Sequence, residues 1–118
     1  MVKKTRPAIV TGHTHRVRTS CGNLFITINQ DNGELCEIFA QIGKSGDCVK
    51  SLLEFACRMT SLALRNGADP RDVVNNIRGI MCPKPCFVGE QQILSCADAI
   101  GLKITETLDK LGYPSASD

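Results

Sequence analysis

Two cysteines flank a Pro-Lys-Pro sequence in the stretch MCPKPCF, residues 81–87. Their thiols could hold a metal ion, exchange electrons as a disulfide, or fill a hydrophobic core. The prolines disfavour a helix and favour a stiff, extended loop that can direct Cys82 and Cys86 at one site. One pair at this spacing does not define a metal site, so its interpretation depends on the other cysteines.

The seven cysteines of this 118-residue chain cannot all pair within one molecule, because their number is odd. The first residues lack the apolar stretch of a signal peptide, and no run of residues is apolar enough to span a membrane. We therefore expect a cytoplasmic location, where clustered thiols indicate metal binding or redox chemistry more often than a disulfide framework.

Three further cysteines lie where structural elements are expected to begin or end. Cys21 falls in a predicted turn, and Cys48 and Cys96 fall in the first turns of predicted helices, where the helix dipole stabilises a thiolate. Together with Cys82 they could converge on one tetrahedral metal site. The alternative is that each thiol packs as a small hydrophobe.

A glycine-rich sequence at residues 43–46 is a candidate anion site, because it precedes a predicted helix. It is not a Walker loop, since Ile38 stands where that motif needs glycine. Backbone N–H groups and Lys44 could still bind a phosphate, whereas Asp47 would cap the same groups, which favours a plain turn. The candidate ligand-binding residues are Gly43, Lys44, Ser45, Gly46, Arg16 and Arg18.

Basic residues are concentrated near the N-terminus, although the net charge is only +2. The first thirty residues contain no acid and carry Lys3, Lys4, Arg6, Arg16 and Arg18. Such an arm can contact an acidic partner, but its simpler role is to remain solvated. Nucleic-acid binding is not expected, because the chain has no Trp and few aromatic residues on which bases could stack.

The elements that must position these residues begin with an antiparallel sheet. A strand is expected at residues 13–19, and residues 23–29 and 34–42 alternate apolar and polar side chains with the period of strands that bury one face. An Asn-Gly pair at positions 32 and 33 is typical of a tight hairpin turn. Cys36 lies on the apolar face of its strand and is expected to pack in the core.

Helices are predicted for the second half of the chain. The longest covers residues 47–66, and Cys57 in its middle is expected to pack. A short helix follows Asp69, and the last spans residues 95–111 with Ser95 as N-cap and Asp98 in the capping-box position. The residues assigned to the buried face of the long helix, from their helical spacing, are Cys48, Leu52, Phe55, Met59 and Leu62.

Strands followed by helices predict an α+β fold: a small antiparallel sheet of two or three N-terminal strands, covered by about three helices. Residues 1–12 are expected to form a basic flexible arm, residues 13–112 a single domain, and residues 113–118 a tail.

Four blocks of the sequence, in order, resemble the TSCPD domain. They are RPAIVTGHTHRVRTSCGNLFITIN, IGKSGDC, GIMCPKP and LSCADAI, which together cover residues 6–108. This domain is found near the C-terminus of adenosylcobalamin-dependent (class II) ribonucleotide reductases and as small free-standing proteins. The chain departs from the family at the namesake motif, since it reads Leu94-Ser95-Cys96-Ala97-Asp98 where the family has Thr-Ser-Cys-Pro-Asp.

The resemblance implies that Cys21, Cys48, Cys82 and Cys96 are the family's recurrent cysteines, which form a metal or structural cluster. Cys86 is a candidate extra ligand, and zinc or an iron–sulfur cluster is the expected cofactor. The catalytic barrel of the reductases and its cobalamin site do not fit in this chain, so we expect no nucleotide reduction by the chain alone.

Three functions are consistent with the sequence. The first is a free-standing accessory domain that holds a structural metal and is linked to deoxyribonucleotide metabolism and DNA synthesis, with a reductase as partner. The second is a binding module for a nucleotide or nucleotide-derived messenger at the glycine-rich helix start. The third is a thiol redox partner in which Cys82 and Cys86 cycle. Self-association into a homo-oligomer is compatible with all three.

Overall fold

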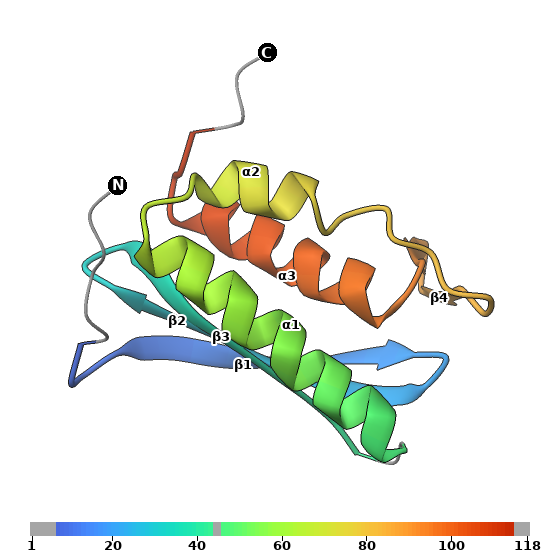
Figure 1. The fold of residues 1–118 in the computed structure, drawn as a ribbon. Helices are drawn as coiled ribbons and strands as arrows, with labels where there is room; N and C mark the ends of the chain where they lie inside the picture. The colour runs from blue at the N-terminus through green and yellow to red at the C-terminus, as the bar shows by residue number, and fades with distance from the viewer. Residues whose placement is uncertain (1–6, 44–45, 115–118) are drawn as a thin grey trace.

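The computed structural model describes residues 7–43 and 46–114, and its first layer is a three-stranded antiparallel sheet. The strands β1 (Thr11–Thr19), β2 (Gly22–Asp31) and β3 (Glu34–Ile42) lie side by side in chain order. Figure 1 shows the helices together on one face of this sheet. The predicted α+β fold with an N-terminal antiparallel sheet is therefore confirmed.

The hairpin between β2 and β3 is closed by the predicted Asn-Gly turn. Asn32 and Gly33 have backbone φ angles of 52° and 82°, the left-handed values that a tight hairpin turn requires of its two central residues. The register places Ile28 opposite Ile38, so the apolar faces of both strands coincide. Leu24 and Ile26 on the same face of β2 have no exposed surface.

The second layer consists of three helices and a small extra sheet. The helices are α1 (Asp47–Arg65), α2 (Pro70–Asn75) and α3 (Cys96–Lys110). The extra sheet pairs β4 (Cys86–Val88) with β5 (Gln91–Ile93) in antiparallel fashion. This short hairpin occupies part of the region that the sequence indicated as a loop, because three-residue strands are too short to show a clear alternation.

Ordered backbone is found close to both ends of the described chain. β1 begins at Thr11, within the predicted arm, whereas residues 1–6 lie outside the described part of the chain. At the other end, the guanidinium of Arg71 donates hydrogen bonds to the carbonyl oxygens of Tyr113 (2.7 Å) and Pro114 (3.0 Å). The start of the predicted tail is therefore bound to α2.

The long helix buries a different face from the one predicted. The exposed fractions of Leu52, Phe55, Met59 and Leu62 are 64%, 63%, 51% and 39%, so the predicted core stripe faces solvent. The buried residues of α1 are instead Leu53, Cys57, Ser61 and Leu64.

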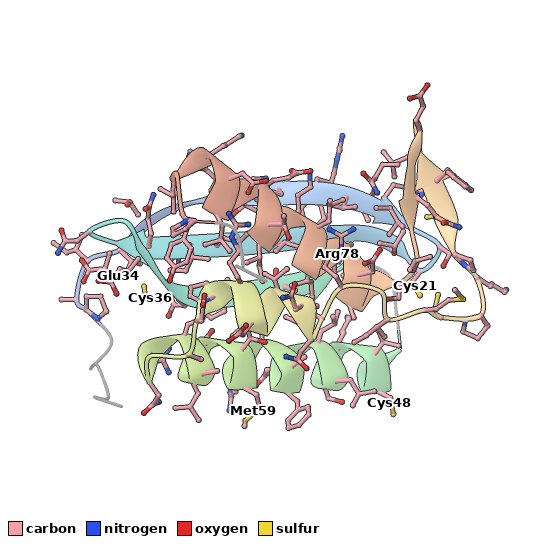
Figure 2. All side chains as sticks on the ribbon, turned by 90° about the horizontal axis from the view of Figure 1, so that it is seen from above. Cys21, Glu34, Cys36, Cys48, Met59 and Arg78 are labelled. Carbon is pink, nitrogen blue, oxygen red and sulfur yellow. The ribbon has the colours of Figure 1, made fainter. Side chains whose placement is uncertain are left out.

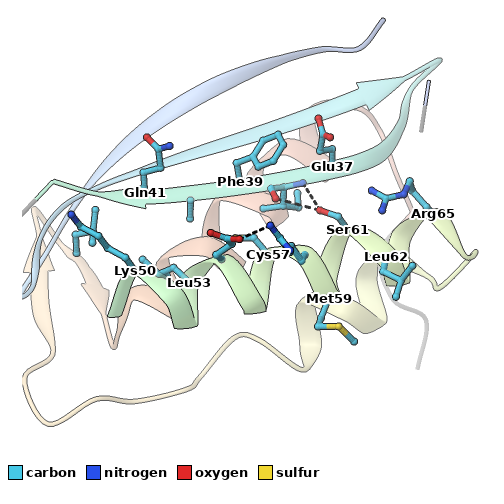
Figure 3. Close-up of a pocket in the computed structure, with 15 residues that line it drawn as sticks. Glu37, Phe39, Gln41, Lys50, Leu53, Cys57, Met59, Ser61, Leu62 and Arg65 are labelled. Atoms are coloured by element: carbon cyan, nitrogen blue, oxygen red, sulfur yellow. Dashed lines mark hydrogen bonds and ion pairs between the residues drawn. The ribbon is translucent and has the colours of Figure 1, made fainter. Parts of the chain in front are cut away.

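Hydrogen bonds to the edge of β3 explain the orientation of α1. The Ser61 hydroxyl accepts a hydrogen bond from the Ile38 N–H (2.9 Å) and donates one to the Ile38 carbonyl oxygen (3.3 Å). Arg65 donates a further bond to the carbonyl oxygen of Cys36 (3.3 Å). Figure 3 shows Ser61 directed at the strand and Met59 and Leu62 directed away from it. Because a strand edge needs polar partners, the face of α1 that contains Ser61 turns inward.

The core lies between the sheet and the helices. Ile26, Ile38, Ile104 and Leu108 are each at most 1% exposed, which places α3 directly over the sheet. Cys36 and Cys57 are buried, as expected for packing residues. Within residues 7–43 and 46–114, no helix has both the length and the apolar character needed to cross a bilayer.

Burial of Cys57 predicts a loss of stability in alkali. Burial raises the pKa of this thiol from 9.0 to about 11. Above pH 9 the unfolded chain loses a proton that the folded chain retains, so the free energy of unfolding should fall, by about 2 kcal/mol in total between pH 9 and pH 11. Urea denaturation across this pH range measures the effect.

The matched variants for this measurement are Cys57→Ala and Cys48→Ala. Cys57→Ala should show a shallower decline of stability above pH 9, although it is less stable at neutral pH. Cys48 is exposed, and its replacement should leave the pH dependence unchanged. An identical pH dependence in the wild type and Cys57→Ala would contradict the prediction.

Candidate functional site

The thiol of Cys96 lies at the start of α3, against the last residue of β1. Its sulfur is 3.4 Å from the hydroxyl oxygen of Thr19, which is itself buried. Burial raises the pKa of Cys96; the hydrogen bond with Thr19 opposes this effect, and the nearby thiols of Cys21 and Cys82 add to it. Three cysteines that are far apart in the sequence therefore meet beyond the end of β1.

Cys86 reaches the same end of β1 from the small hairpin. Its sulfur is 3.7 Å from the carbonyl oxygen of Arg18, the residue before Thr19. The carbonyl oxygen of Leu94 accepts a hydrogen bond from the N–H of Cys82 (3.0 Å), which holds the other side of the Pro-Lys-Pro loop. Both cysteines of the opening motif are thus positioned close to β1.

Cys48 does not lie beside the other three recurrent cysteines. It is exposed at the start of α1, and Figure 2 shows it apart from Cys21, on the side of α1 that faces away from the sheet. Within residues 7–43 and 46–114, no three or more His, Cys, Asp or Glu side chains are already arranged to hold a metal ion. The four-cysteine metal site therefore stays a prediction, and the structure brings three of its members together.

A buried carboxylate fixes the loop that carries Cys82 and Cys86. Asp98 is 2% exposed, and its Oδ1 atom accepts hydrogen bonds from the guanidinium of Arg78 and the N–H of Gly79, both at 3.0 Å. Its Oδ2 atom accepts one from the N–H of Leu94 (3.2 Å). Burial alone would raise the pKa of Asp98, but these donors hold it below its ordinary value.

Ser95 is the N-cap of α3, as predicted, but Asp98 does not complete a capping box. The Ser95 hydroxyl accepts a hydrogen bond from the Asp98 N–H (3.0 Å) and donates one to the Ile80 carbonyl oxygen (2.5 Å). The Asp98 carboxylate turns instead to Arg78 and the backbone beyond it. The ion pair between Arg78 and Asp98 was not predicted from the sequence. The available signal was Asp98 itself, a charged residue in the otherwise mostly apolar segment that follows Cys96.

The residues predicted to bind an anion are only partly described. Gly43 lies at the same end of the sheet as Arg18, because its N–H donates to the carbonyl oxygen of Asn23, which pairs with Arg18. Gly46 is the N-cap of α1 and provides no side-chain cap, so Asp47 is the first helical residue rather than the cap. Lys44 and Ser45 lie outside the described residues. Arg16 and Arg18 are exposed on β1, where Val17 between them is buried.

Sequence reasoning also missed a groove between β3 and α1. It has a volume of about 880 Å³ and is lined by backbone and side chains of both elements, among them Phe39, Lys50 and Glu54 (Figure 3). Leu53 and Cys57 contribute its apolar part. The groove does not contain the cysteine cluster at the end of β1.

Comparison with known proteins identifies one family. The model of the TSCPD domain matches residues 1–108, which is most of the chain. No curated protein and no solved structure matches the chain.

The hydrogen bonds of Asp98 predict that Asp98→Asn destabilises the fold. The amide would lose charge-assisted bonds and present N–H groups to donors, so the free energy of unfolding should fall by about 3 kcal/mol. Asp109→Asn is the control, because Asp109 pairs with Arg71 but its side chain is 63% exposed. This control should cost about 1 kcal/mol or less.

The same carboxylate gives the prediction a pH dependence. Since the pKa of Asp98 is lower in the folded state, its contribution is present at neutral pH and is lost as pH falls below 3.8. Denaturation of wild type and Asp98→Asn at neutral and acidic pH measures both effects. Equal stability of the two proteins at neutral pH would show that the carboxylate does not hold the loop.

Proposed function

Because the chain belongs to the TSCPD domain family, we propose that it is an accessory domain related to the C-terminal domain of class II ribonucleotide reductases. We propose that it holds a structural zinc ion through Cys21, Cys82 and Cys96, with Cys86 as the fourth ligand. The domain acts in deoxyribonucleotide metabolism by binding a reductase partner, and that partner carries out the nucleotide reduction.

The convergence of thiols around Thr19 carries this proposal. The thiols of Cys21 and Cys82 lie near enough to Cys96 to raise its pKa, and Cys86 lies against the residue before Thr19. Four thiol sulfurs from a turn, a loop, a strand and a helix start are the donor set that zinc prefers, and thiolate-rich tetrahedral sites favour zinc or iron–sulfur clusters. The proposal requires the Pro-Lys-Pro loop to move Cys82 and Cys86 onto one ion with Cys21 and Cys96.

The electrostatics of the cluster support a metal more than redox cycling. The pKa of Cys96 is raised by burial and by its neighbouring thiols, so the Cys96 thiol is protonated at neutral pH. A redox-active cysteine needs a lowered pKa, because the thiolate is the nucleophile. A divalent cation instead displaces the protons and compensates the charge of the thiolates it binds.

The choice of Cys86 over Cys48 follows from position. Cys86 is partly buried and lies beside β1, whereas Cys48 is exposed at the start of α1. A zinc ligand needs its sulfur about 2.3 Å from the ion. Cys48 could reach the cluster only if the start of α1 were rearranged.

The experiment is a metal assay on protein purified without oxygen and under reducing conditions. We expect about one zinc per chain in the wild type. Replacing Cys21, Cys82, Cys86 or Cys96 by Ser should reduce both the metal content and the melting temperature. Zinc affinity should also rise with pH, because the ion competes with protons for the thiols.

The matched control is Cys48→Ser, which should retain zinc and melt as the wild type does. Loss of zinc in Cys48→Ser, with retention in Cys86→Ser, would restore the set of four recurrent cysteines and contradict the choice of Cys86. A folded wild-type protein that binds no zinc or iron after reconstitution would refute the metal site itself.

A second candidate function is nucleotide binding at the start of α1. Its support is that Gly46, the N-cap of α1, has no side chain with which to cap the helix, and that Arg18 lies at the same end of the sheet. We expect a nucleotide to raise the melting temperature of the wild type but not of Lys44→Ala. Arg58→Ala, which removes a cation from the other half of α1, is the control; no shift with a panel of nucleotides would exclude this function.

A further inference from the structure

The three-stranded sheet has a second face, which is turned away from the helices. Leu24, Ile26 and Ile28 of β2 are buried on the helix side, so the residues between them point to the other side. Figure 1 shows the three helices together on the first face, and none of the described helices lies over the second. The side chains on this second face, here called the open face, therefore remain available to a ligand.

Two of the four phenylalanines of the chain are neighbours on the open face. Phe25 of β2 is 41% exposed and Phe39 of β3 is 49% exposed. Since Phe25 pairs with Gln41 and Phe39 pairs with Thr27, the two phenylalanines occupy diagonal positions on adjacent strands, which are about 7–8 Å apart. Figure 3 shows Phe39 and Gln41 on the side of β3 that is turned away from α1.

The exposed charges beside these rings are positive. Arg16 and Arg18 of β1 are exposed, and neither side chain forms an ion pair with a carboxylate of residues 7–43 or 46–114. The carboxylate of Glu37, in the row beyond Phe39, is 4% exposed and accepts a hydrogen bond from the amide of Asn29 (2.9 Å). A ligand on the open face therefore meets two free cations beside two aromatic rings, with little negative charge.

The register brings the cations and the rings into one patch. Arg16 lies directly opposite Phe25, so their Cβ atoms are about 5 Å apart, and Arg18 lies one row further along β1, opposite Asn23. In the row on the other side of Arg16, the hydroxyl oxygens of Thr14 and Thr27 are 2.7 Å apart, which shows that both threonines share this face. The patch thus combines charge, aromatic surface and small polar groups across all three strands.

We propose that the open face binds single-stranded nucleic acid. Two bases stack on Phe25 and Phe39, and the guanidinium groups of Arg16 and Arg18 bind phosphates of the same strand. This reverses the expectation from the sequence, in which few aromatic residues gave no platform for bases. The platform exists only once β2 and β3 pair, because Phe25 and Phe39 are far apart in the chain.

A single strand suits the open face better than other polyanions. In a duplex the bases stack on one another, so a double-stranded ligand leaves Phe25 and Phe39 without a partner. An acidic peptide can pair with the arginines but does not carry an aromatic ring in every unit, whereas every base has a π-face. Binding should tolerate many sequences, because stacking and phosphate contacts do not read base edges.

The first test is a fluorescence-anisotropy titration of labelled oligothymidylate and oligouridylate, each of about ten nucleotides, with the full chain. Phe25→Leu and Phe39→Leu should each raise the dissociation constant at least about fivefold, because leucine keeps an apolar contact but has no ring for stacking. Phe55→Leu is the matched control, since Phe55 is 63% exposed but lies on α1. This control should bind as the wild type does.

The salt dependence tests the arginines. Each phosphate contact to a single strand contributes about −0.7 to the slope of the logarithm of the association constant against the logarithm of the salt concentration. Arg16→Gln and Arg18→Gln should each weaken binding and make this slope less steep by about 0.7. Arg58→Gln, which removes an exposed cation from α1, should change neither the affinity nor the slope.

Four outcomes would overturn the proposal. The first is no binding of either oligonucleotide at about 1 mM protein in low salt. The second is an unchanged dissociation constant in Phe25→Leu and Phe39→Leu while both variants remain folded by circular dichroism. The third is a polyglutamate peptide of equal length that competes as well as the unlabelled oligonucleotide, which would show a surface selective for charge alone. The fourth is a set of NMR amide shifts confined to the start of α1, whereas the proposal expects them on β1, β2 and β3.

Discussion

The carboxylate of Asp98 is the group on which the arrangement of the second half of the chain depends. It receives hydrogen bonds from the residues just before the Pro-Lys-Pro loop and just after the small hairpin, and it belongs to α3. One side chain therefore joins both ends of a segment that has no large apolar residue in the core other than Ile93. A charged group can do this inside a protein only because every lone pair that it directs inward has a donor.

The cysteine cluster is a consequence of that arrangement. Cys96 is positioned by the helix that contains Asp98, and Cys82 and Cys86 by the segment that Asp98 closes, while Cys21 comes from the first hairpin of the sheet. The thiols thus belong to two separate parts of the fold, the sheet and the segment that packs beside it. Any bond through the cluster would fasten the loop segment to the sheet.

The sequence was sufficient to predict the elements whose residues alternate in a simple way. The hairpin of β2 and β3 was found because Leu24, Ile26 and Ile28 share one face and an Asn-Gly pair follows. The orientation of α1 was not predicted, because the outer face of this helix is more apolar than its inner face. The inner face includes Ser61, whose hydroxyl binds the edge of β3. Periodicity finds an apolar face but does not say which of two faces the domain itself buries.

The candidate site was predictable only in part for a related reason. Spacing and family resemblance selected Cys21, Cys82 and Cys96, but the exposure of Cys48 depends on how α1 is rotated about its axis, which the edge of β3 determines. The position of Cys86 beside β1 depends on the β4–β5 hairpin, whose strands are too short for pattern reasoning. Both positions are decided by hydrogen bonds between distant segments and not by local preference.

The contact of Ser61 with Ile38 also affects whether the β3 edge of the sheet can pair with a strand of another molecule. An uncovered outer strand invites a strand of another molecule to pair with it, which is the first step of many protein aggregates. Here a hydroxyl one carbon away from the helix backbone binds the N–H and the carbonyl oxygen of Ile38 at the middle of the strand, and a longer side chain would separate the helix from the strand. A module that is attached to other proteins, or made in quantity by itself, benefits from an edge that is closed in its own folded state and needs no chaperone to shield it.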